Sequence, residues 1–276
     1  MIMLVGTKGV LSSAIQEVFN GESIHIVDQA AAYSWASPTT GNRIAEYVST
    51  LRDKPKLILN ASGIVDPTAS PEVLINVNYN LPKNLAEFAN QNGTKLVTFG
   101  TIMENFEDLA VSNPYLSSKK KYYDYFVRSS QQHASVLHLQ AHTWYGGNKL
   151  KSHMFLGQIF SAIQKRTIFK MSMGKQLREY HHLFDDLCAL KHLLNSGAYG
   201  VFQLNHGEAL SLQEVASHVF SEFNLSELLR IGVLPMSSNE NLDATFLPDR
   251  LLSEVAFRGT LRGITDYMRF LLNGEK

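Results

Sequence analysis

The chain has little of several features that would narrow its function at once. It contains one cysteine, Cys188, among 276 residues, which excludes an intrachain disulfide and a zinc site built on several cysteines. No apolar run approaches the roughly 18 residues that a membrane span needs, and Met1–Val5 is too short for a signal peptide. Neither sign of charge dominates, since 25 Lys and Arg residues balance 25 Asp and Glu residues. We therefore expect a soluble cytoplasmic protein that binds neither nucleic acid nor membrane.

Short apolar runs alternate with amphipathic stretches through the first half of the chain. The runs are rich in Val, Ile and Leu and lack polar alternation, which is typical of parallel strands covered by helices on both faces. They predict strands at residues 2–5, 23–27, 57–60, 95–99 and 135–139. The stretches between them predict helices at residues 12–19, 44–51 and 81–91. Strand–helix alternation predicts an α/β fold with a doubly wound parallel sheet.

The second half is less regular and predicts a smaller lobe. Helical patterns cover residues 154–165, 186–195 and 264–272, and a capping box at Ser211 and Glu214 opens a further helix. Two glycines interrupt the alternation near residue 147. We predict one domain at residues 1–147 and a C-terminal lobe at residues 148–276, with residues 198–205 returning to the sheet so that the two parts interleave.

A glycine turn follows the first predicted strand and precedes the first predicted helix. It runs from Gly6 through Lys8 and Gly9 to Val10, Leu11 and Ser12. A dinucleotide-binding turn needs one glycine for the tight turn and a second so that backbone can approach the pyrophosphate, which meets N–H groups of the helix. Ser12 stands where a third glycine usually lies. The turn predicts a bound dinucleotide, and an ordinary βα turn is the alternative.

An acidic residue follows the second predicted strand. Asp28 lies 22 residues after Gly6, where a carboxylate can accept hydrogen bonds from the adenosine ribose. Because it would repel a 2′-phosphate, Asp28 slightly favours NAD over NADP as the cofactor. The nearby cations Lys8 and Arg43 oppose that preference.

Three further residues predict an acid–base site. Thr101 follows the strand at residues 95–99, at the sheet edge where open α/β sheets bind ligands, and can hydrogen-bond a substrate carbonyl. Tyr115 and Lys119 are four residues apart and so share one helix face. A tyrosine that exchanges protons near neutral pH needs a pKa below its usual value of about 10, and a neighbouring ammonium lowers that pKa. A basic, aromatic helix face is the alternative interpretation.

The order of these motifs resembles the extended short-chain dehydrogenase/reductase family, of the NAD-dependent epimerase/dehydratase type. Other segments are similar to the family too. Residues 57–63 resemble its cofactor-lining strand, residues 77–87 its asparagine-bearing helix, residues 143–146 the loop after its sixth strand, and residues 172–186 its substrate segment. The resemblance implies a Rossmann domain at residues 1–147 and a mainly substrate-binding lobe at residues 148–276.

The resemblance also implies roles for individual residues. The catalytic residues would be Thr101, Tyr115 and Lys119. NAD or NADP would contact Gly6, Lys8, Gly9, Val10, Leu11, Asp28, Asn60, Ala61, Ser62, Asn78, Tyr115 and Lys119. A nucleotide-sugar substrate would contact Thr101, His142, Thr143, Arg178 and His182.

Within the family, two subgroups resemble the chain most. These are dTDP-4-dehydrorhamnose reductase and the CDP-abequose synthase type, which both reduce a C4 ketone on a nucleotide-linked 6-deoxysugar. The chain departs from the family pattern at Ser12, at Gly100, where many members have serine, and at Gln140, where many have arginine. A nucleotide-sugar epimerase or dehydratase on the same scaffold is one alternative, and a non-catalytic dinucleotide-binding sensor is another.

The remaining candidate residues give weaker evidence about function. His182 and Asp186 have the spacing of two metal ligands on one helix face, but no third ligand has a suggestive spacing, so we expect no metal. Cys188 is expected in the core. The family often dimerises, and the aromatic residues Tyr122, Tyr125 and Phe126 are the face that we expect to serve a homodimer.

Overall fold

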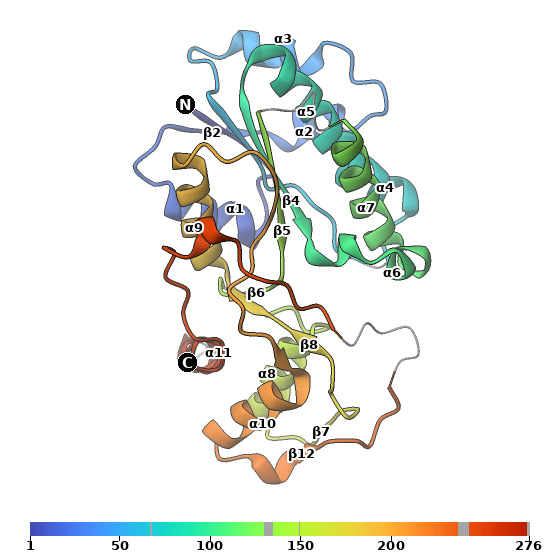
Figure 1. Ribbon diagram of the computed structural model, residues 1–276, viewed down its shortest axis with the longest axis vertical. Coiled ribbons are helices and arrows are strands. Elements are labelled where there is room, and N and C mark those ends of the chain that lie inside the picture. The colour runs from blue at the N-terminus through green and yellow to red at the C-terminus, as the bar shows by residue number, and fades with distance from the viewer. Residues whose placement is uncertain (67, 130–134, 149, 237–242, 275–276) are drawn as a thin grey trace. The chain divides into compact units, whose positions relative to one another are not determined.

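Six short apolar strands form one parallel sheet in the computed structural model, which describes residues 1–276 except 67, 130–134, 149, 237–242 and 275–276 (Figure 1). The sheet order is β10-β5-β4-β3-β1-β2, and each neighbouring pair is parallel. The strands are β1 (Ile2–Val5), β2 (Ile24–Val27), β3 (Leu57–Asn60), β4 (Lys95–Thr101), β5 (Val136–Ala141) and β10 (Gly200–Gln203). This confirms the doubly wound α/β fold.

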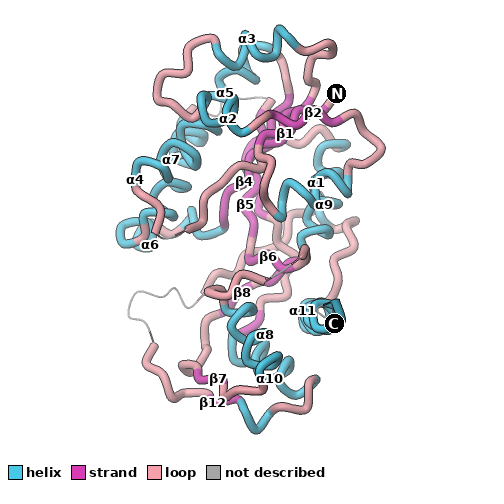
Figure 2. Tube along the Cα trace, turned by 180° about the vertical axis from the view of Figure 1, so that it is seen from behind, coloured by secondary structure: helices cyan, strands magenta, loops and turns pink. Residues whose placement is uncertain are grey.

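Helices cover both faces of this sheet (Figures 1 and 2). One face packs against α2 (Gln29–Trp35), α3 (Arg43–Thr50), α5 (Leu81–Asn92) and α7 (Pro114–Arg128), which share a buried core with strands β1 to β5. The short α4 (Pro71–Ile75), the π-helix η1 (Asn76–Asn80), the 3₁₀-helix η2 (Ile102–Asn105) and α6 (Glu107–Ser112) flank them. On the other face lie α1 (Val10–Val18) and the end of α9 (Leu183–Asn195), where Lys191 Nζ donates to Val18 O at 2.8 Å.

The chain divides into two compact units. The first comprises Met1–Ala141 and Lys191–Leu204, and the second comprises His142–Leu190 and Asn205–Lys276. In the first unit, the strand order reverses between β1 and β3, because the chain leaves β1 toward β2 and later returns on the other side. Ligands of open α/β sheets bind outside the carboxyl ends of strands at such a point. The residues after β1 and β3 are therefore where a ligand is expected.

The second unit is built from short strand pairs and three longer helices. The pairs are β6 (Thr143–Tyr145) with β9 (Tyr180–His182), β8 (Leu177–Arg178) with β11 (Leu210–Ser211), and β7 (Phe169–Lys170) with β12 (Leu229–Arg230). The helices are α8 (Phe155–Lys165), α10 (Leu212–Glu222) and α11 (Thr260–Gly274), and two 3₁₀ turns lie at η4 (Ser226–Leu228) and η5 (Arg250–Leu252). The capping box is confirmed, since Ser211 Oγ accepts from Glu214 N at 3.1 Å.

Two expectations about side-chain placement are wrong. Cys188 is exposed, because the buried positions of α9 include Leu187 and Leu190, and residue 188 points away from them. Tyr122 and Phe126 are 2% and 1% exposed in the core beneath α7, so they do not form a free aromatic face for a partner. In the part of the chain that the structure describes, no helix is both long and apolar enough to cross a bilayer.

Candidate active site

The turn between β1 and α1 approaches the end of β3 closely. Gly6 has a φ of +110°, which favours glycine, and a Cβ there would lie 2.8 Å from Ser62 N. Ala61 N donates to Val5 O at 2.8 Å, so the two strand ends are joined directly. By contrast, no atom beyond the adjacent residues lies within 4 Å of where a Cβ on Gly9 would stand. The turn is therefore tight at its first glycine and open at its second.

Helix α1 begins at this open position without a side-chain cap. Its N-cap is Gly9, and no side chain accepts a hydrogen bond from the first turn. The N–H groups of Val10, Leu11 and Ser12 have no partner within the helix, because the first intrahelical bond is from Ser13 N to Gly9 O at 3.0 Å. Such uncapped N–H groups, with the positive end of the helix dipole, suit an anion. Lys8 is exposed beside them.

The loop after β3 is tied to helix α7 by one buried amide. Asn78, on η1, donates to Ile64 O at 2.9 Å and to Ser118 Oγ at 3.0 Å, and it accepts from Ile64 N at 3.0 Å. Within the same loop, Asn60 Oδ1 accepts from Ser62 N at 3.2 Å. Asn78 therefore holds the loop at residues 60–64 against α7 through hydrogen bonds from its own side chain.

Asp28 caps the helix that follows β2. Its Oδ1 accepts from Ala31 N at 2.8 Å, and the residue is exposed. Arg43 is engaged nearby, where its Nη1 donates to Ser34 O at 3.2 Å. The carboxylate at the end of β2 is thus fixed by the helix N-terminus, with its charge open to solvent.

Thr101, Tyr115 and Lys119 lie on β4 and on the helix beside it. Thr101 ends β4, and its Oγ1 accepts from Met103 N at 3.4 Å. Asn113 caps α7 by accepting from Tyr115 N at 3.0 Å, which sets where the helix starts. Lys119 Nζ donates to Phe99 O of β4 at 2.7 Å, so the ammonium is anchored two residues before Thr101. A Cβ on Gly63 would lie 3.6 Å from the same Nζ, which joins the loop after β3 to this group.

A buried carboxylate that the sequence interpretation left unused lies near these residues. Glu104 is 1% exposed and accepts hydrogen bonds from Thr101 N at 3.1 Å, from Gln140 Nε2 at 3.2 Å and from the His138 ring at 3.0 Å. The other ring nitrogen of His138 lies 2.8 Å from Thr98 Oγ1. The position of Glu104 on a short 3₁₀ turn, three residues after a strand-end threonine, is a capping-box pattern that could have pointed to it.

Gly100 leaves the space for this pair. A Cβ at Gly100 would lie 2.4 Å from Glu104 Oε2 and 2.5 Å from His138 Nε2. The serine that the family resemblance implies at this position would therefore collide with the carboxylate and the ring. The absence of a side chain at Gly100, which departs from the family pattern, thus makes room for the buried Glu104 carboxylate.

The pKa of Tyr115 is raised, whereas the sequence interpretation expected it to be lowered. Burial is the main cause, and the negative charge of Glu104 adds to it. Lys119 donates to Phe99 O instead of the Tyr115 hydroxyl, and burial lowers the pKa of Lys119 against the opposing effect of Glu104. The phenol therefore carries its proton throughout the neutral range.

The second unit holds the other predicted site residues. Thr143 and Arg178 are half-buried, and Arg178 Nη1 donates to Leu177 O at 2.7 Å. His182 packs on Gly146, where a Cβ would lie 2.9 Å from its Nε2. Burial, aided by the charge of Arg258, lowers the pKa of His182 to about 4, so this imidazole is neutral at pH 7.

His142 belongs to a buried cluster that sequence spacing does not reveal. It is 9% exposed, and its ring is stacked with that of His181, whose ring is stacked in turn with that of His206. Burial, with the nearby His181, lowers the pKa of His142 to about 4. Burial alone would also lower the pKa of His181, but the carboxylates of Asp186 and Glu179 raise it to about 9. His142 comes directly before β6, His181 lies in β9 and His206 lies between β10 and β11, so segments far apart in sequence form the cluster.

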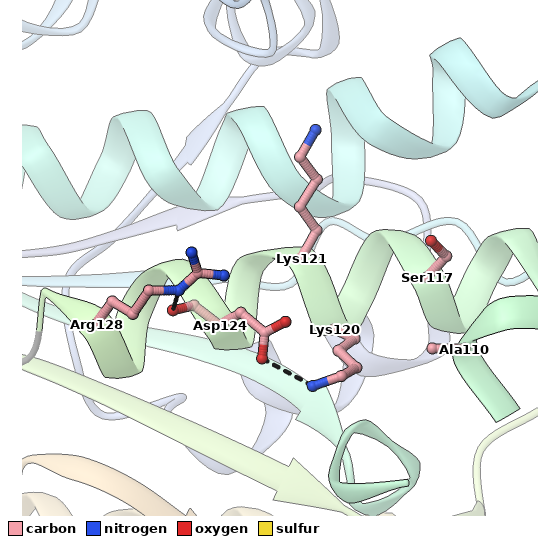
Figure 3. A pocket seen from close by; sticks show the side chains of 6 residues that line it. All are labelled: Ala110, Ser117, Lys120, Lys121, Asp124 and Arg128. Carbon is pink, nitrogen blue, oxygen red and sulfur yellow. Dashed lines mark hydrogen bonds and ion pairs between the residues drawn. The ribbon is translucent and has the colours of Figure 1, made fainter. Parts of the chain in front are cut away.

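A surface pocket of the first unit is lined by none of the predicted site residues. Figure 3 shows its lining side chains along α7, where Lys120 Nζ pairs with Asp124 Oδ1 at 2.8 Å. Its lining residues are Ala110, Ser117, Lys120, Lys121, Asp124 and Arg128. Tyr115 and Lys119 are absent from this lining, so the pocket is not the predicted active site.

The doubly wound sheet, the open glycine turn and the tyrosine–lysine helix define a class of dinucleotide-dependent enzymes. The model of the NAD dependent epimerase/dehydratase family matches residues 2–204. The chain belongs to this family, which confirms the family resemblance and makes it an NAD(P)-dependent enzyme of the oxidoreductase type. Comparison with curated proteins finds no match.

Several solved structures are similar to this one over nearly their whole length. The dTDP-4-dehydrorhamnose reductase of Yersinia enterocolitica is 15% identical, with a TM-score of 0.76, over 98% of this chain and 99% of that one. The Bacillus anthracis reductase of the same name, in complex with NADP, is 17% identical, with a TM-score of 0.74, over 98% and 97%. UDP-glucose 4-epimerase of Thermus thermophilus, in complex with NAD, is 17% identical, with a TM-score of 0.71, over 97% and 98%. At these identities the likeness establishes the fold.

Proposed function

We propose that the chain uses a nicotinamide dinucleotide to reduce the C4 ketone of a nucleotide-linked 6-deoxyhexose, in the synthesis of deoxysugars or surface polysaccharides. Two of the similar structures are dTDP-4-dehydrorhamnose reductases, which supports a nucleotide-sugar substrate. The first unit would hold the dinucleotide, and the second would hold most of the sugar nucleotide.

The residues around the first turn fit a dinucleotide. The open space at Gly9 and the uncapped N–H groups of Val10 and Leu11 would receive the pyrophosphate, with exposed Lys8 beside them. Asp28 would accept hydrogen bonds from the adenosine ribose, and this favours NAD slightly over NADP. The loop of Asn60, Ala61 and Ser62, held by Asn78, would line the rest of the cofactor. When bound, the reduced dinucleotide supplies the hydride.

The acid–base chemistry would come from three side chains of the first unit. Thr101 would hydrogen-bond the ketone oxygen, and the Tyr115 hydroxyl would donate its proton to that oxygen as negative charge develops there. Lys119, anchored on Phe99 O, would hold the nicotinamide ribose and keep a positive charge near the phenol.

From the second unit, Arg178 would bind the diphosphate, for which a guanidinium is suited, and Thr143 and His182 would contact the nucleotide sugar. Because His142 is buried in its own cluster, its proposed part is to shape this region.

The placement of Tyr115 and Lys119 on α7, with Lys119 Nζ donating to Phe99 O near the end of β4 at 2.7 Å, is the observation that carries the proposal, and the raised pKa of Tyr115 agrees with it. A ketoreductase needs a phenol that can donate, whereas an epimerase must begin with a phenolate that removes a hydroxyl proton. Burial and the charge of Glu104 both favour the protonated phenol. The site is thus better suited to reducing a ketone than to starting from an alcohol.

A turnover assay with defined sugars tests this function. The purified chain is mixed with NADH or NADPH and a panel of CDP-, dTDP-, UDP- and GDP-linked 4-keto-6-deoxyhexoses. We expect loss of reduced-nicotinamide absorbance matched by an equal amount of 4-hydroxy product. Interconversion of C4 epimers without net consumption of NADH would contradict reduction, and so would dinucleotide binding without turnover of any sugar. As a control, Gly9→Trp fills the open space at the turn and should abolish dinucleotide binding.

A further inference from the structure

The second unit contains a histidine–carboxylate cluster that the proposed reaction does not use. One nitrogen or oxygen atom from each of His142, Glu179 and His181 lies within 4.8 Å of the others, and all three residues are buried. We propose that these residues bind a divalent transition-metal ion, and zinc is the ion to test. Two imidazoles and one carboxylate form an established ligand set for zinc, which would leave a fourth position for water.

Each histidine already has its other ring nitrogen occupied, as metal-binding histidines do. His181 Nδ1 lies 2.7 Å from Asp186 Oδ1, and Trp144 Nε1 holds the second oxygen of Asp186 at 2.6 Å. With its Nδ1 donating to Asp186, His181 presents the lone pair of Nε2 on the side of Glu179. Asp186 therefore orients a ligand, which differs from the direct role that its spacing from His182 suggested.

The environment of His142 fixes which of its nitrogens carries the proton. Asn205 Nδ2 donates to Leu247 O at 3.1 Å, so the Oδ1 of Asn205 is the atom that faces His142 Nε2, at 2.6 Å. Since an amide oxygen only accepts, Nε2 must donate. Nδ1 of His142 then keeps its lone pair, and no described residue donates to it. We infer that Nδ1 is the atom through which His142 would bind the metal ion.

The hydrogen bonding of the Glu179 carboxylate is an independent observation that points to a bound cation. Its Oε2 accepts from His206 N at 2.9 Å and lies 3.0 Å from His181 Nε2. Its Oε1 is buried and has no hydrogen-bond partner. A buried carboxylate oxygen without a partner is costly, and a cation is the partner that it suits best.

The charges of the groups in the cluster also favour a bound cation. Two buried carboxylates, those of Glu179 and Asp186, lie 3.0 and 2.7 Å from the two ring nitrogens of His181. A divalent ion bound at Nε2 would offset the negative charge of these two carboxylates. Arg258 does not serve this purpose, because its Nη2 pairs with Asp185 Oδ1 at 2.7 Å. The ion would join the start of β6, after His142, to the start of β9, after Glu179, and so stabilise the second unit.

Metal content tests this inference independently of turnover. The full chain, with any affinity tag removed, is treated with a chelator, dialysed against Zn²⁺, gel-filtered and analysed by mass spectrometry for zinc. We expect about one zinc per chain, and a thermal midpoint several degrees higher with zinc than without it. His142→Gln and Glu179→Gln should lose both effects, whereas His153→Ala, which changes an exposed histidine of the same unit, should keep both.

Two results would overturn the site. One is a wild-type chain that retains no zinc and has the same midpoint with and without it. The other is retention of zinc by His142→Gln and Glu179→Gln at the wild-type level. If both variants fail to fold, Co²⁺ decides with the wild-type chain alone. A stoichiometric visible absorption band supports the site, and no band overturns it.

Discussion

At the scale of single residues, the structure gives a physical reason for the glycine at position 100. The buried carboxylate of Glu104 occupies the space that a side chain at position 100 would need. Glu104 then holds Thr101 N through a hydrogen bond and raises the pKa of Tyr115 through its charge. The strand end, the buried acid and Tyr115 are therefore coupled.

Replacing Glu104 by Gln should move the pH dependence of ketone reduction. The phenol donates only while protonated, so the rate falls as pH rises through the pKa of Tyr115. Glu104 disfavours the phenolate, and its removal should lower that pKa and shift the alkaline fall to lower pH. Rate–pH profiles of both proteins measure the shift. An unchanged alkaline limb in a folded Glu104→Gln protein would mean that the carboxylate does not act on Tyr115.

Adding one methyl group at position 100 should be costly. In Gly100→Ala the new Cβ meets the Glu104 carboxylate and the His138 ring at 2.4 and 2.5 Å, so the buried pair must move. We expect a loss of about 1–3 kcal/mol in the free energy of unfolding, the usual range for overpacking. Gly21→Ala is the control, because nothing lies within 4 Å of its Cβ position. Denaturant titration compares the two, and equal stabilities would contradict the close packing described for Gly100.

At the scale of elements, the link that matters most is the one from the loop after β3 to helix α7. Asn78 makes this link from a π-helix, where the widened turn interrupts an otherwise helical segment. The family resemblance implies that Asn78 contacts the cofactor, and the hydrogen bonds of its side chain to Ile64 and Ser118 add a second, structural role. Asn78 would act on the cofactor by fixing the loop that lines it.

The variant Asn78→Ala should therefore weaken dinucleotide binding as well as stability. It leaves Ile64 N and O and Ser118 Oγ without their amide partner, at a cost of roughly 2 kcal/mol. Asn80→Ala is a matched control on the same π-helix, since Asn80 Nδ2 bonds only to Asn76 Oδ1 among the contacts described. Fluorescence titration with NADH should show weaker binding in Asn78→Ala alone. Equal affinities for the two variants would contradict the role of this link.

Helices and strands could be predicted from the sequence where their burial requires a clear pattern of apolar residues. The strands of the sheet are apolar runs because helices cover both faces, and each predicted strand lies within two residues of the observed one at either end. Helix α2 was missed, since its Ala-rich sequence has no clear apolar period, although Asp28 is a good N-cap. The two- and three-residue strands of the second unit were missed because so few residues establish no pattern.

At the scale of the whole molecule, the order of motifs along the chain was enough to predict the family. It was not enough to predict the contacts between residues that are far apart in sequence. Tyr115 and Lys119 are one turn apart, so their common helix face follows from spacing. Glu104 meets His138 from another strand, and His142 meets Glu179 from another segment, so neither pair has a spacing that could reveal it. Both contacts could be identified only from the three-dimensional structure.

The most direct test of the account is the effect of Tyr115→Phe on reduction of a 4-keto-6-deoxyhexose substrate identified in the turnover assay. The hydroxyl would donate the proton but would not hold the dinucleotide. The variant should therefore bind NADH with nearly wild-type affinity. Its rate of reduction should fall by about 10²–10⁴-fold, the usual contribution of one positioned proton donor. Stopped-flow measurement of NADH oxidation in both proteins gives the comparison. A Tyr115→Phe protein that reduces the ketone at the wild-type rate would contradict the assignment of Tyr115 as the proton donor.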